Sequence, residues 1–132
     1  MLPVLAWVTI VVIVDPFNYF NISHKISEKA KLESAQKLNS LLYNLVEFKN
    51  NPSPHIIIGD SRIRKLPTER IKEISGDDYF TLHANAAKLN EIIDLFWLAD
   101  EYSKLENVIL GINFNLYNEY AYSNRTADAK EL

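Results

Sequence analysis

Three short apolar segments alternate with two helical patterns in the second half of the chain, and this alternation constrains the fold most strongly. The predicted strands are residues 55–58, 79–83 and 108–112. Predicted helices over residues 67–75 and 89–103 separate them. Continuous apolar runs of this length are typical of strands that are buried on both faces. We therefore predict an α/β domain in three layers, with a parallel sheet of strand order 2-1-3 and helices on both faces.

The loops that follow the three predicted strands are expected to carry the function. Parallel strands end at one edge of their sheet, and open α/β sheets bind ligands beyond that edge, where the strand order reverses. The loops in this position are residues 59–64, 84–88 and 111–118. Candidate site residues are therefore sought in these three loops.

Composition removes several classes of function. The chain has 14 lysine and arginine residues against 17 acidic ones and a net charge of −3. This balance argues against general nucleic-acid binding, which needs a basic surface. The absence of cysteine excludes cysteine nucleophiles and thiolate metal sites. Neither a metal-ligand spacing nor a glycine-rich phosphate loop occurs. We therefore expect no metal and no cofactor.

The chain begins with an apolar segment, residues 1–14, which reads MLPVLAWVTIVVIV and contains no charged side chain. As a helix it spans about 21 Å, which is shorter than the hydrocarbon core of about 30 Å. Phe17, Tyr19 and Phe20 follow, and aromatic residues are typical of the membrane interface. We interpret residues 1–20 as a signal anchor or transmembrane segment. The alternative is a buried helix or strand of a soluble domain.

Residues 24–49 have the pattern of one long helix. Its apolar residues recur at three- and four-residue spacing: Leu38, Leu41, Leu42, Leu45 and Val46. Pro52 and Pro54 follow and end the helix. We therefore predict a helical spacer and linker over residues 21–54, followed by the α/β domain over residues 55–132.

A serine follows the first predicted strand in the sequence Gly59-Asp60-Ser61-Arg62. A serine placed after a buried strand and a glycine turn projects its hydroxyl above the sheet, as a nucleophilic serine requires. We expect the Asp60 carboxylate to make hydrogen bonds within the turn. Arg62 is a candidate for binding an anionic group of a substrate, because guanidinium groups bind carboxylates and phosphates in pairs of hydrogen bonds. The alternative for Arg62 is a solvated helix face.

Gly59-Asp60-Ser61 resembles the first conserved block of the SGNH (GDSL-type) hydrolases, which have a flavodoxin-like sheet. The resemblance implies that Ser61 is the nucleophile. Gly111-Ile112-Asn113 is similar to the third block of the family, which implies that the Asn113 side chain donates a hydrogen bond to the oxyanion. The family has an oxyanion-binding glycine after its second strand. Here Ala86 and Ala87 stand in that loop, and their backbone N–H groups are the candidates.

The fourth block of the family, a late Asp-x-x-His, does not occur in this sequence. The chain has three histidines, His24, His55 and His83. Of these, His83 stands at the carboxyl end of its predicted strand and is a candidate base, although a packing role is the more common one for such a histidine. The resemblance covers residues 55–118. We expect the chain to be the amino-terminal part of a longer protein, with the base in the remainder.

The overall pattern looks like the membrane-anchored SGNH-like proteins of bacterial envelopes. This resemblance implies a serine esterase or acyltransferase that acts on an O-acyl ester of an envelope polymer, such as an acylated glycan, and is inactive as this fragment. The alternatives are a non-catalytic envelope protein for binding or assembly, and a cytoplasm-facing module that binds an anion at Arg62. The resemblance places the domain outside the cytoplasm. Lys25, Lys29 and Lys31 indicate the opposite orientation.

Overall fold

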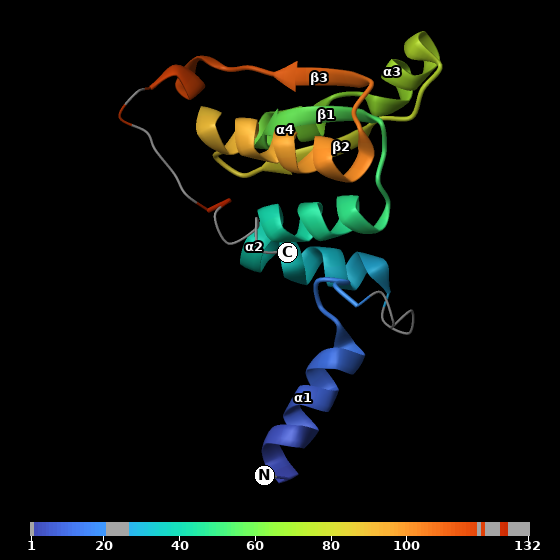
Figure 1. Ribbon diagram of the computed structural model, residues 1–132, viewed down its shortest axis with the longest axis vertical. Coiled ribbons are helices and arrows are strands. Elements are labelled where there is room, and N and C mark those ends of the chain that lie inside the picture. The colour runs from blue at the N-terminus through green and yellow to red at the C-terminus, as the bar shows by residue number, and fades with distance from the viewer. Residues whose placement is uncertain (1, 21–26, 119, 121–124, 127–132) are drawn as a thin grey trace. The chain divides into compact units, whose positions relative to one another are not determined.

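The computed structural model describes residues 2–20, 27–118, 120, 125 and 126, and only the backbone at 28–30, 32–34 and 36–38. The chain forms two compact units, Met1–Asn50 and Asn51–Leu132 (Figure 1). The second unit contains the sheet and the candidate site.

The first unit begins with helix α1, Leu2–Val14. Large apolar side chains on every side of α1 are exposed: Leu2, Val4, Leu5, Trp7, Val8, Ile10, Val11 and Ile13. The helix ends where the sequence predicts, because Asp15 has a positive φ of 42° and accepts hydrogen bonds from the backbone N–H groups of Tyr19 and Phe20. Within the part of the chain that is described, no helix has both the length and the apolarity to cross a membrane.

The predicted single long helix is wrong in one respect, because helix α2, Glu28–Asn50, is interrupted at Asn39. The Asn39 backbone is not helical (φ −153°, ψ 91°), and its Oδ1 accepts the Leu42 N–H at 3.0 Å. Asparagine in this role starts a new helix. Lys31 Nζ and Asn50 Nδ2 both reach Asn18. Since a straight helix would hold these two residues about 28 Å apart, the two halves of α2 must fold back on each other.

The sheet confirms the predicted α/β class and strand order. Its strands are β1 (His55–Asp60), β2 (Phe80–Ala84) and β3 (Asn107–Gly111). Both neighbours of the central strand β1 run parallel to it, in the order β2-β1-β3. β1 carries three fully buried isoleucines, Ile56, Ile57 and Ile58, as expected for a strand that is covered on both faces. β1 extends two residues beyond its predicted end, so Gly59 and Asp60 belong to the strand.

The two helices of this unit contribute unequally to its core. Helix α4, Leu89–Ser103, packs against β1 and buries Ile92, Leu95 and Leu98. Helix α3, Thr68–Ser75, buries no residue, and Ile74 on it is exposed. Helix α3 therefore contributes no buried side chain to the core. Its end is set by Gly76, whose φ of 82° is a common helix terminator.

Two glycines lie side by side at the carboxyl end of the sheet. Gly59 of β1 pairs with Gly111 of β3. A short 3₁₀ helix, η1 (Ser61–Lys65), follows β1 and packs the buried Ile63 over this pair. A Cβ atom on Gly59 would lie 2.8 Å from Ile63 Cγ2, and one on Gly111 would also collide with that methyl. The absence of both side chains lets η1 lie against the sheet and fixes the position of Ser61.

Candidate functional site

The structure brings together most of the predicted site residues at one edge of the sheet. β1, β2 and β3 run parallel, so their carboxyl ends meet there. A cavity of about 220 Å³ lies at this edge, which we call the serine cavity. Its lining residues are Asp60, Ser61, Arg62, Ala86, Ala87, Lys88, Asn113 and Asn115. Side chains and backbone from all three loops after the strands therefore face one small, polar space.

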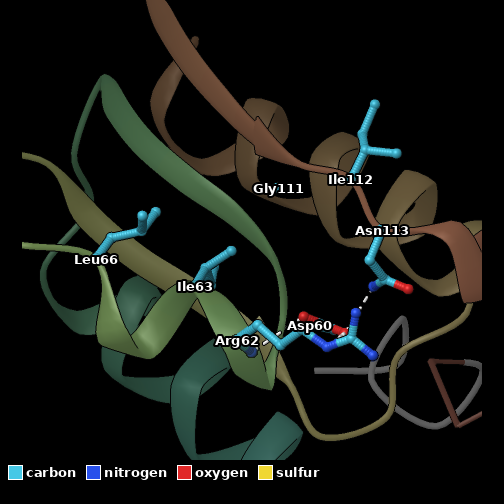
Figure 2. A pocket seen from close by; sticks show the side chains of 7 residues that line it. All are labelled: Asp60, Arg62, Ile63, Leu66, Gly111, Ile112 and Asn113. Atoms are coloured by element: carbon cyan, nitrogen blue, oxygen red, sulfur yellow. Dashed lines mark hydrogen bonds and ion pairs between the residues drawn. The ribbon is translucent and has the colours of Figure 1, made fainter.

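Asp60 organises the serine cavity through its buried carboxylate. Oδ1 accepts the backbone N–H of Arg62 at 3.0 Å, which caps η1 as the turn prediction anticipated. Oδ2 accepts Nδ2 of Asn113 at 2.7 Å and lies 3.5 Å from Nε of Arg62 (Figure 2). Asp60 thus joins the end of β1 to the loop after β3, a role that sequence reasoning did not assign to it.

Asn113 is held at both ends of its side-chain amide. Its Oδ1 accepts the Asn115 N–H at 2.9 Å and caps a second 3₁₀ helix, η2 (Phe114–Tyr117). Its Nδ2 carries two hydrogens, and Asp60 accepts one of them. In the contacts among the described residues, the second hydrogen has no acceptor, and Asn113 lines the same cavity as Ser61. A donor fixed in this way suits the binding of a carbonyl or carboxylate oxygen.

In the loop after β2, one of the two candidate oxyanion donors already has a backbone acceptor. The Ala87 N–H donates to the Ala84 carbonyl at 3.2 Å, closing a tight turn. That N–H is therefore occupied in this turn. Ala86 has a left-handed backbone with φ of 51°, and its N–H stays a candidate donor. Both residues line the serine cavity, so they shape its wall.

His83 is a buried residue near the carboxyl end of β2. It is buried on β2 in register with Gly59, and it does not line the serine cavity. Burial lowers the pKa of the His83 imidazole below its usual value, and the nearby positive charge of Arg64 lowers the pKa further. The imidazole is therefore neutral at neutral pH. The role of His83 as a base for Ser61 stays a prediction.

Two basic side chains face the serine cavity. Arg62, predicted as a substrate-binding residue, lines it and is mostly exposed. Lys88 also lines it, and sequence reasoning missed this residue. Its position at the start of α4 was the available signal, because a residue just before a helix at the carboxyl edge of the sheet faces the ligand side.

An ion pair with a buried carboxylate supports the loop that contains Ala86 and Lys88. Glu91 is fully buried and accepts two hydrogen bonds of 2.7 Å from Nε and Nη2 of Arg125. Arg125 Nη1 also donates to the Asn85 carbonyl, and the Lys88 N–H donates to Glu91 Oε2. The loop is thereby fixed from both sides. Sequence reasoning missed both partners, although Glu91 stands at the third position of its helix, where a carboxylate commonly caps.

A second cavity adjoins the serine cavity. It has a volume of about 170 Å³, and we call it the side cavity. Its apolar wall consists of the side chains of Ile63 and Leu66, and Gly111 and Ile112 also line it (Figure 2). Asp60, Arg62 and Asn113 line both cavities. The two spaces thus share a polar boundary.

Comparisons with protein families, with curated proteins and with solved structures found no match for this chain. Within the described residues, no group of three or more histidine or acidic side chains is arranged to hold a metal ion. The functional argument therefore depends on the geometry of the serine cavity.

Proposed function

We propose that the serine cavity is an acyl-transfer site of the SGNH type that takes an O-acyl ester of an envelope polymer. The observation that supports this most directly is that Ser61 and Asn113, from loops after different strands, line one cavity. In the proposed step, Ser61 Oγ attacks the ester carbonyl carbon and loses its proton to a base. The carbonyl oxygen becomes an oxyanion, which the free N–H of Asn113 Nδ2 and the backbone N–H of Ser61 stabilise.

A second candidate function is the binding of an acylated or anionic ligand without catalysis. The specific observation in its favour is that the lining of the serine cavity contains no histidine. Without a base, a serine hydroxyl keeps its proton, and loss of a triad member costs several orders of magnitude in rate. Arg62 and Lys88 supply positive charge for a carboxylate in such a binding site.

We also propose that residues 1–20 attach the chain to a membrane, with the α/β domain outside the cytoplasm. The exposed apolar side chains around α1 support attachment, since burying each of them in lipid is worth roughly 1.5–3 kcal/mol. The short span of α1 is compatible with local thinning of the bilayer.

Formation of a serine adduct with methylboronic acid tests the acyl-transfer site. A serine oxygen adds to boron and releases a proton, and the tetrahedral product has its own ¹¹B NMR signal. We expect this signal with the whole chain, no signal with Ser61→Ala, and at least about tenfold weaker binding with Asn113→Ala, because a charge-assisted hydrogen bond is lost. Asn118→Ala changes an exposed asparagine that lines neither cavity, and this matched control should bind normally. No tetrahedral signal, or one that persists in Ser61→Ala, overturns the proposal.

Ester turnover then separates the two candidate functions. The measurement is hydrolysis of 4-nitrophenyl butyrate by the detergent-solubilised chain and by Ser61→Ala. An adduct without Ser61-dependent turnover supports ligand binding by the serine cavity without catalysis. Turnover that requires Ser61 shows that the chain itself contains a base, and His83→Gln tests whether that base is His83.

A further inference from the structure

The side cavity has the properties of a subsite for a short hydrocarbon chain. Ile63 and Leu66 give it an apolar wall, and Gly111 leaves its floor without a side chain (Figure 2). The polar groups lie at one end of the cavity, where Asp60 and Asn113 hydrogen-bond to each other. The Asp60 carboxylate already accepts hydrogen bonds from the Arg62 N–H and from Asn113 Nδ2. The ligand therefore does not need a positively charged group to pair with it.

We propose that the side cavity holds the acyl chain of the ester whose carbonyl lies at Ser61, and that this chain has about four to six carbon atoms. The inference rests on the function proposed for the serine cavity and specifies its substrate. Asp60, Arg62 and Asn113 border both cavities. A molecule with its carbonyl at Asn113 therefore reaches the apolar wall without crossing a separate barrier.

The volume of the side cavity sets the chain length. A cavity of about 150 Å³ lined by aliphatic and aromatic side chains accommodates benzene, which has six carbons. The side cavity, at about 170 Å³, is of similar size. An acetyl group leaves most of this space unfilled, and a long-chain lipid extends past it into water.

A second apolar cavity provides an internal comparison. It has a volume of about 290 Å³ between α4 and β3, and its lining includes Ile93 and Trp97. None of its lining residues borders the serine cavity. An acyl chain attached at Ser61 should therefore enter the side cavity and not this one.

The test uses straight alkylboronic acids of one, three, five and nine carbons and the ¹¹B signal of the Ser61 adduct. We expect affinity to rise about twofold to fourfold per methylene up to five carbons, because each methylene leaves water, and then to level off. Leu66→Phe fills the side cavity and should abolish the preference for five carbons over one. Since Leu66 lines this cavity and is 39% exposed, this change leaves the core intact. Ile93→Phe, in the comparison cavity, should keep the preference.

The outcomes separate this inference from the proposed function. A Ser61-dependent adduct whose affinity does not change with chain length overturns the acyl subsite and leaves the acyl-transfer site standing. Affinity that continues to rise to nine carbons, or a preference that Ile93→Phe removes and Leu66→Phe does not, overturns the subsite as well. Absence of the tetrahedral signal with every acid overturns the proposed function itself.

Discussion

Asn113 Nδ2 donates a hydrogen bond of 2.7 Å to the buried Oδ2 of Asp60, although 53 positions separate the two residues in the sequence. This bond joins the end of the central strand to the loop that follows the edge strand. It leaves one hydrogen of the Asn113 amide directed elsewhere, and it places Asn113 on the cavity that Ser61 also lines. The candidate site thus depends on one long-range polar contact.

An exchange of the two side chains tests this contact. Asp60→Asn alone should destabilise the fold by about 1–3 kcal/mol, because two amide donors then face each other at a buried position. Adding Asn113→Asp restores a donor opposite an acceptor and should recover most of that loss. The measurement is urea unfolding followed by Trp97 fluorescence in a Trp7→Phe background. A double variant whose loss equals the sum of the two single losses would show that the residues do not interact.

A second prediction concerns the packing of Ile63 over the glycine pair. Gly111→Ala should cost about 1–3 kcal/mol, since the new methyl collides with Ile63 Cγ2. In an Ile63→Ala background the same substitution should cost much less, because the colliding methyl is gone. Ile63→Val keeps a branched Cβ and is the matched control, in which the full cost should remain. An equal cost in all three backgrounds would contradict the packing seen here.

Much of the fold could be predicted from local sequence. The run Ile56-Ile57-Ile58 indicated a doubly covered strand, and the alternation of strands with helices implied the parallel order that the structure has. The convergence of Ser61 and Asn113 followed from that order, since parallel strands end at one edge. Serine cavity residues at the strand ends were therefore accessible to sequence reasoning.

The remaining features depend on contacts that local sequence does not show. Asn39 interrupts α2 because its side chain caps the following turn, yet its neighbours have a continuous helical pattern. The Ala87 N–H is occupied because Ala86 adopts a left-handed backbone, which alanine rarely does. Glu91 and Arg125 lie 34 positions apart, and only the folded chain pairs them.

His83 predicts a pH dependence of stability. Its folded-state pKa lies below the ordinary value of 6.5, so the unfolded chain takes up a proton first as the pH falls. The contribution of neutral His83 to the free energy of unfolding is complete above about pH 6.5. Below that pH the free energy of unfolding falls by at most about 1.4 kcal/mol per pH unit. His83→Leu should remove this pH dependence. The measurement is urea unfolding between about pH 7.5 and about pH 5.5, which bracket the ordinary pKa of histidine.

Arg64 provides the control for the His83 prediction. Its charge contributes to the lowered pKa of His83, so Arg64→Gln should make the slope shallower. Arg70→Gln removes a positive charge from α3 and should leave the slope unchanged. A slope that is the same in wild type and His83→Leu would show that His83 does not cause it.

Membrane attachment is tested by flotation of the chain with phospholipid vesicles. We expect the wild type to float, because α1 exposes apolar side chains on all sides. Val8→Lys combined with Val11→Lys should abolish flotation, since each lysine near the centre of an apolar segment costs about 3 kcal/mol. Ile74→Lys alters an even more exposed apolar residue, on α3, and should float like the wild type. Wild-type chain that stays with the unbound fraction would contradict attachment.

The most direct test of a shared Ser61–Asn113 site is the NMR signal of the Asn113 side-chain amide in the ¹⁵N-labelled chain. On addition of methylboronic acid, we predict that the two Asn113 Nδ2 proton resonances shift in wild type, because one of them binds the new boronate oxygen, and that they stay in place in Ser61→Ala. An adduct that forms on Ser61 without moving the Asn113 resonances, or an equal shift in Ser61→Ala, would show that the two residues do not act on one ligand.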